Sequence, residues 1–102
     1  MTKRHDRDDR RSSILTIALS RAADVGYMHV TREDIALAVG CSPALVSHHL
    51  GTMKQMRRAI MGEAIRTANL RIIAQGLAHG DPRALGADPD LRSAAAASIA
   101  GV

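Results

Sequence analysis

Three residues near the middle of the chain carry side chains that could do chemistry: Cys41, His48 and His49. Thiol and imidazole groups can bind zinc or form a nucleophile and base. The two histidines are adjacent, not four residues apart on one helical face, so a zinc site would need remote ligands such as His29 or His79. A single cysteine excludes a disulfide within the chain, and we expect Cys41 to be buried in a core, without a redox or metal role.

The sequence contains no pattern that predicts catalysis or a cofactor. It offers no nucleophile with a base at plausible reach, no glycine-rich phosphate loop and no pair of carboxylates in an apolar setting. We therefore expect a protein that is not an enzyme and that holds neither a cofactor nor a metal. The chemistry left to this region is hydrogen bonding, by Ser47 and His48 in particular.

Basic residues are concentrated in the first part of the chain. Residues 1–58 contain ten Lys and Arg against six Asp and Glu, whereas residues 59–102 contain four of each, so the formal charge of +4 arises entirely before residue 59. No acidic residue occurs from Ile35 to Gly62. Such a distribution suits a polyanion such as DNA, because phosphate contacts dominate the affinity of DNA-binding proteins.

The elements that must position these residues are helices. Phe and Trp are absent and Tyr27 is the only aromatic residue, so the core must consist of Leu, Ile, Val, Met and Ala, which favours helix over sheet. Apolar residues recur at helical spacing over residues 12–25, and Gly26 ends that helix. Thr31 with Asp34 resembles a capping box ahead of a second, short helix that ends at Gly40.

The next two helices also begin at capping residues. Ser42 followed by Pro43 is an N-cap with proline at the first helical position, so a third helix is expected over residues 43–50. Thr52 with Gln55 repeats the capping-box spacing and opens a fourth helix, expected to continue to about Ala78. Two further helix starts are expected, each at an Asp followed by Pro: Asp81-Pro82 and Asp88-Pro89. The second precedes a short helix expected over residues 91–100.

The second and third helices have the spacing of a helix-turn-helix. That motif needs a small residue where the helices cross, a residue that tolerates positive φ in the turn, and an apolar anchor in the second helix. Ala36, Gly40 and Val46 meet these needs at intervals of four and six positions along the chain. We therefore predict an all-α helical bundle with a helix-turn-helix and a short C-terminal helical segment.

Residues 12–61 resemble the N-terminal DNA-binding domain of TetR-type repressors. The resemblance is ungapped and rests on Gly26, Tyr27, Val30, Thr31, Asp34, Ile35, Ala36, Gly40, Cys41, Ser42, His48, His49, Leu50 and Lys54. The short length and residues 45–53 are also similar to KorC-type repressors of broad-host-range plasmids. TetR-type proteins usually have Tyr or Phe late in the third helix and a ligand-binding domain of roughly a hundred further residues. This chain has neither, so the resemblance implies no small-molecule inducer.

In a helix-turn-helix the second helix enters the major groove, and its outward side chains meet the base edges. With Val46 and Leu50 turned inward, Ser47 and His48 could exchange hydrogen bonds with bases, while small apolar side chains could contact thymine methyl groups. The candidate base contacts are Pro43, Ala44, Leu45, Ser47 and His48.

Phosphates are expected near helix starts, where free N–H groups and the helix dipole favour an anion. The candidate phosphate contacts are Thr31, Arg32, Ser42, His49, Thr52, Lys54 and Arg57. Residues 1–11 lack apolar periodicity and are expected to form a flexible charged arm, whose acidic residues oppose a DNA contact. The cations of that arm that could nevertheless reach the backbone or the minor groove are Lys3, Arg4, Arg10 and Arg11.

One helix-turn-helix covers too little DNA for useful specificity, so we expect a homodimer on a palindromic operator. Residues 12–62 are the expected DNA-binding domain, and residues 63–102 are the expected dimerising extension. The expected dimer interface consists of Ile65, Leu70, Ile73, Leu77, Leu91 and Ile99.

The sequence therefore predicts a transcriptional regulator that binds a specific double-stranded DNA site and acts as a repressor. The alternative is a small helical module that binds another protein and no DNA. No apolar run reaches the roughly 18 residues of a transmembrane helix, and the N-terminus lacks a secretory pattern. We expect a bacterial cytoplasmic protein without a membrane partner.

Overall fold

The described part of the chain folds into helices joined by short loops, as its composition predicts, and it contains no strand. The structure is a computed structural model that describes residues 3–100, with side chains described for residues 9–98. The helices are α1 (Lys3–Val25), α2 (Arg32–Val39), α3 (Pro43–Leu50), α4 (Met53–Arg66), α5 (Leu70–His79), α6 (Pro82–Leu85) and α7 (Pro89–Ala100).

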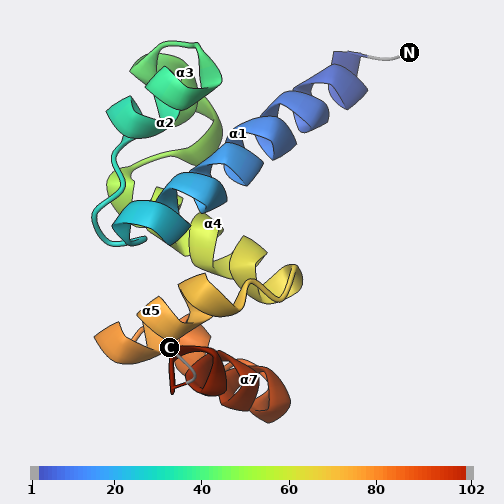
Figure 1. The fold of residues 1–102 in the computed structure, drawn as a ribbon. Coiled ribbons are helices and arrows are strands. Elements are labelled where there is room, and N and C mark those ends of the chain that lie inside the picture. The colour runs from blue at the N-terminus through green and yellow to red at the C-terminus, as the bar shows by residue number, and fades with distance from the viewer. Residues whose placement is uncertain (1–2, 101–102) are drawn as a thin grey trace.

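Helix α1 is the central element of the N-terminal half. Helices α2, α3 and α4 all pack against it, and α2 and α3 also pack on each other (Figure 1). Helix α4 leads away from α3 to the C-terminal helices, where α5 packs against both α6 and α7. Helices α2 and α3 therefore lie at one end of an elongated molecule, and α7 lies at the other end (Figure 1).

One hydrophobic core runs through the whole molecule. It joins buried side chains from α1 to α4 with Ile72 and Ile73 of α5, Ala84 of α6 and Ala95 of α7. The largest fully buried side chains are Tyr27, Ile14, Ile35, Met56, Ile60, Met61, Ile72, Ile73, Val30 and Val46. Residues 12–62 and residues 63–102 therefore share a core, and the C-terminal helices contribute directly to the packing around α4 and α5.

The expected flexible arm over residues 1–11 needs correction, because α1 already begins at Lys3. No Gly or Pro interrupts the sequence between Lys3 and Val25. Once the apolar part of α1 has formed, each further residue needs only propagation, which costs far less than nucleation. The charged N-terminal turns of α1 extend beyond α2 and α3 as a continuous helix (Figure 1).

The fourth helix ends twelve residues earlier than the expected boundary at Ala78, and a new helix follows it. Asn69 caps α5, because its side chain accepts the N–H of Ile72 at 3.2 Å. Ala68 has a positive φ of 56°, which an alanine rarely adopts and which stops α4. Asn69 then donates its N–H to the carbonyl of Ala64 at 2.7 Å, so the turn between the helices is closed by hydrogen bonds.

The last helices begin where the Asp-Pro pairs predict. Asp81 accepts the N–H groups of Arg83 and Ala84 and so caps α6, and Asp88 accepts the N–H of Asp90 at the start of α7. None of the helices described here is both long and apolar enough to cross a bilayer.

Candidate nucleic-acid interface

Helices α2 and α3 are joined by the short turn 40–42 and pack against each other, as a helix-turn-helix requires. Ala36 is buried at the crossing, and Gly40 has the positive φ, 85°, that the sequence predicts for the turn. The carbonyl of Ala36 accepts the N–H groups of both Gly40 and Cys41, at 2.8 and 3.0 Å. Val46 is fully buried on the other side of the turn, so α3 is braced against α2.

Capping residues set the ends of both short helices. Thr31 and Asp34 form the predicted capping box at α2, and the side chain of Ser42 accepts the N–H of Leu45 at 3.2 Å at the start of α3. Pro43 occupies the first helical position, as predicted. These hydrogen bonds lie within three residues of each cap, so local sequence suffices to place α3.

The outward side of α3 is open to solvent. Pro43, Ala44 and His48 are exposed, whereas Leu45 and Ser47 are half-buried at the margin. Val46 and Leu50 point into the core. The five candidate base contacts are therefore accessible to different degrees, and three of them form the fully exposed part of the surface.

Arg32 and Ser47 are joined in a way that the sequence does not indicate. Nη1 of Arg32 donates to Oγ of Ser47 at 2.7 Å, across the α2–α3 packing. The arginine was expected on a phosphate and the serine on a base, yet each contacts the other. The Ser47 hydroxyl accepts from Arg32 and can still donate its own proton outward.

The two histidines late in α3 contact each other. Their rings meet edge to face with centroids 5.1 Å apart, His48 exposed and His49 half-buried. Cys41 is half-buried against the core, and its thiol lies 3.5 Å from the carbonyl of Ser42. Among the described residues, no three His, Cys, Asp or Glu side chains are grouped as metal ligands.

The helix starts differ in how well they suit a phosphate. Helix α2 has Glu33 and Asp34 in its first turn, and these carboxylates oppose an anion near Thr31. Helix α4 has no acidic residue in its first turn, and its capping box uses the neutral side chain of Gln55 with Thr52. The start of α4 is therefore the more favourable phosphate site.

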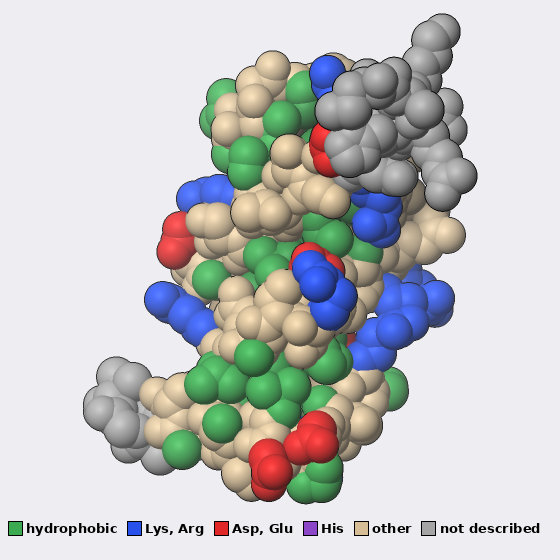
Figure 2. All heavy atoms as spheres, turned by 90° about the vertical axis from the view of Figure 1, so that its right-hand side faces the viewer, with side chains coloured by type: hydrophobic (Ala, Val, Ile, Leu, Met, Phe, Trp, Pro, Cys, Tyr) green, Lys and Arg blue, Asp and Glu red, His purple; other side chains and the backbone are tan. Residues whose placement is uncertain are grey.

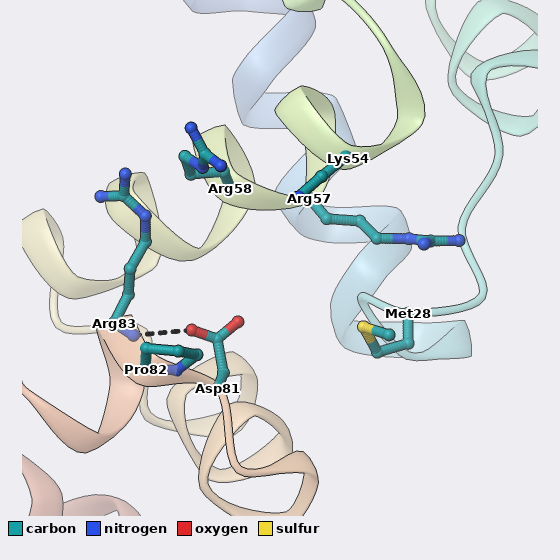
Figure 3. Close-up of a pocket in the computed structure, with 7 residues that line it drawn as sticks. All are labelled: Met28, Lys54, Arg57, Arg58, Asp81, Pro82 and Arg83. Atoms are coloured by element: carbon teal, nitrogen blue, oxygen red, sulfur yellow. Dashed lines mark hydrogen bonds between the residues drawn. The ribbon is translucent and has the colours of Figure 1, made fainter.

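A row of cations continues from the start of α4. Lys54 and Arg58 are exposed, while Arg57 is half-buried with an Nε atom that is buried and has no hydrogen-bond partner. These residues line a cavity of about 580 Å³ together with Met28, Asp81, Pro82 and Arg83 (Figure 3). Arg83 comes from α6, and no spacing pattern in the sequence groups it with α4.

Some of the remaining residues predicted to contact DNA or a second protomer have exposed side chains, and the side chains of others are not described by the structure. Arg10 and Arg11 lie exposed on α1. The side chains of Lys3 and Arg4, predicted as arm contacts, and of Ile99, predicted in the dimer interface, lie outside the described ones.

The expected dimer interface needs one correction. Ile73 is fully buried in the protomer's own core, because α6 and α7 cover α5, so it has no surface left for a second copy. Ile65, Leu70, Leu77 and Leu91 are half-buried and keep part of their surface. Hydrophobic side chains gather on the lower half of the face in Figure 2, over the C-terminal helices, with Lys and Arg side chains above them.

No protein-family model, no curated protein and no solved structure matches this chain. Functional interpretation therefore depends on the geometry of the chain itself.

Proposed function

We propose that the protein is a sequence-specific regulator of transcription that binds double-stranded DNA as a homodimer and represses by occupying a palindromic operator. The observation that carries the proposal is the open outer side of α3 on a helix braced by Ala36 and Val46. A helix held in this way can enter the major groove, where its outward side chains read the bases. The order of helices and caps supports the resemblance to TetR-type DNA-binding domains as part of the same proposal.

In this proposal α3 reads the bases and α4 fixes the register. His48 reaches base edges, Ser47 donates from a hydroxyl oriented by Arg32, and Ala44 contacts thymine methyl groups. Lys54 and the free N–H groups at the start of α4 hold a phosphate. The face offers no Arg, Asn or Gln for a bidentate base contact, so each base contributes modestly to discrimination.

The decisive experiment is selection of bound fragments from random duplex DNA, followed by a gel shift on the selected sequence. We expect a palindrome whose half-sites are about one helical turn apart, since each protomer presents one α3. Binding should weaken steeply as salt is raised, because counterions are released from the phosphates. Failure to enrich any duplex at low salt contradicts the proposal and favours the protein-binding alternative.

The reading face is tested by the double substitution Ser47→Ala with His48→Ala. We expect affinity for the selected site to fall at least tenfold, while affinity for unrelated DNA changes little, because the phosphate contacts remain. The matched control is His29→Ala with Ser93→Ala, both exposed and outside α3, which should bind like the parent protein. Unchanged discrimination in the α3 variant would show that another surface reads the bases.

A further inference from the structure

The cavity between α4 and α6 has an unusual balance of charge. Its lining contains four cations, Lys54, Arg57, Arg58 and Arg83, and one carboxylate, Asp81. Oδ2 of Asp81 accepts the Tyr27 hydroxyl at 2.8 Å, and Oδ1 accepts the N–H of Arg83 at 2.8 Å. Within the part of the chain that the structure describes, none of the four cations forms a salt bridge with a carboxylate.

The cations come from two helices and surround one space. Arg58 of α4 and Arg83 of α6 line the cavity from separate helices, and Lys54 lies one turn before Arg58 (Figure 3). Arg57 extends across the other side of the cavity toward the loop that carries Met28 (Figure 3). Like charges that line one cavity repel each other, and an anion between them would offset this repulsion.

Arg57 is the half-buried cation of the lining. Its Nε donor is buried without a hydrogen-bond partner, as is the Nε donor of Arg92 outside the cavity. Buried donors in folded proteins are nearly always satisfied by protein, water or a ligand. Because this Nε atom is closed to water, an anion in the cavity would be held by the charge of the four lining cations.

We propose that this cavity binds a small molecule carrying at least two phosphate groups. Guanidinium groups match phosphate oxygens with two parallel hydrogen bonds, and cations spread over two helices can engage more than one phosphate. The volume of about 580 Å³ falls within the usual range for small-molecule sites. A duplex is a poorer fit, because one wall of this concave space is α6, which belongs to the end of the molecule away from α3.

Lys54 links this cavity to the proposed DNA contacts. The same side chain is the candidate phosphate contact at the start of α4, so an occupied cavity would compete with operator phosphates. This regulatory consequence rests on the proposed function, whereas binding of the polyphosphate does not.

Binding is tested by calorimetric titration of the full chain with inorganic pyrophosphate at low ionic strength, where charges are least screened. The test variant is Arg58→Gln with Arg83→Gln, and the control is Arg66→Gln with Arg71→Gln. The control removes the same charge from exposed arginines outside the cavity. We expect at least tenfold weaker pyrophosphate binding in the test variant and less than a twofold change in the control. Far-UV circular dichroism and thermal unfolding verify that both variants fold.

Three results of the pyrophosphate titration would overturn the inference: no binding by the parent protein at millimolar concentration, unchanged binding by the test variant, or equal losses in both variants. Titration of the same proteins with the selected duplex separates the two proposals. If the test variant loses duplex affinity tenfold more than the control, the cations belong to the DNA interface and the inference fails. If the parent protein binds pyrophosphate and no duplex, the cavity inference stands and the DNA-binding proposal fails.

Discussion

Tyr27, the only aromatic residue, connects the two halves of the molecule. Its backbone N–H donates to Oε1 of Gln75 at 2.8 Å, and its hydroxyl donates to Asp81 at 2.8 Å. Gln75 in turn donates from Nε2 to the carbonyl of Ala22, and the ring of His79 meets the tyrosine ring edge to face. One residue in the loop after α1 is thus held by α5 and by the start of α6.

Ionisation of Tyr27 should weaken the fold. Burial, followed by the hydrogen bond to Asp81 and the charge of that carboxylate, raises the pKa of Tyr27 well above its ordinary value near 10. Above that pH the unfolded chain loses the phenolic proton while the folded chain keeps it. The contribution of this group to the free energy of unfolding should therefore be fully present and independent of pH below pH 10, and it should fall by up to about 1.4 kcal/mol per pH unit above pH 10.

Tyr27→Phe tests this dependence. The variant should lose about 1–2 kcal/mol at neutral pH, because one buried hydrogen bond disappears, and it should show a shallower loss of stability above pH 10. Urea unfolding across this pH range measures both effects. Since the chain has one tyrosine, absorbance of the tyrosinate reports its ionisation directly, and an ordinary titration near pH 10 in the folded protein would contradict the argument.

The crossing of α2 and α3 depends on the size of a single side chain. Ala36→Leu should reduce the free energy of unfolding by about 1–3 kcal/mol, because the added carbons enter a filled space between the helices. Ala38→Leu is the matched control on the exposed side of α2, where we expect a change within about 0.5 kcal/mol. Equal denaturation midpoints for the two variants would show that the crossing is not tightly packed.

At the scale of the elements, the break between α4 and α5 turns the chain back on itself. Because α5 begins a new direction at Asn69, it can pack against α4, α6 and α7 together. A continuous helix to Ala78 could not make these contacts. The close approach is possible because Gly76 of α5 has no side chain where it faces Met61 and Ala84.

Two glycine substitutions of opposite effect test this packing. A Cβ added at Gly76 would lie 2.5 Å from Cε of Met61 and 2.7 Å from Cβ of Ala84, so Gly76→Ala should destabilise the fold by about 1–3 kcal/mol. A Cβ at Gly62, in α4, would meet nothing within 4 Å, so Gly62→Ala should stabilise by about 0.5–1 kcal/mol through helix propensity. Thermal unfolding of the two variants measures whether each substitution raises or lowers stability. Stabilisation by Gly76→Ala would contradict the close packing of Gly76 against Met61 and Ala84.

At the scale of the whole molecule, the C-terminal helices leave apolar surface uncovered. Leu85 of α6 is 49% exposed. Leu77 of α5 and Leu91 of α7 are half-buried and keep part of their surface. We expect this surface to hold the homodimer, with a mass of twice 10.9 kDa by light scattering at micromolar concentration. A monomer mass for the parent protein would contradict the dimer.

Leu85→Asp should shift the protein toward monomer, because a charge at a dimer contact loses its water without gaining a partner. Leu37→Asp is the control, since Leu37 is 86% exposed on α2 at the opposite end of the molecule. Sedimentation measures the mass of both variants in solution. A specific contact at Leu85 predicts a shift to monomer in Leu85→Asp alone, whereas a general effect of reduced hydrophobicity predicts the same shift in both variants.

Local sequence determined the starts of α2, α3, α4 and α6. Thr31, Ser42, Thr52 and Asp81 each bond to an N–H within three residues, so these starts are encoded where they occur, and α3 spans the predicted residues. The same local reasoning wrongly predicted that the first helix begins at residue 12, whereas α1 begins at Lys3. Helix propagation needs no apolar periodicity, so the charged residues 3–11 can continue the helix.

Tertiary structure alone decided which distant residues meet. The hydrogen bonds of Arg32 to Ser47 and of Tyr27 to Asp81 span 15 and 54 positions, and no spacing rule connects such pairs. The reversal at Asn69, which a local cap permits, buried Ile73 and brought Arg83 to the cations of α4. Capping is a short-range interaction that sequence encodes directly, whereas burial and long-range pairing depend on how the finished helices pack.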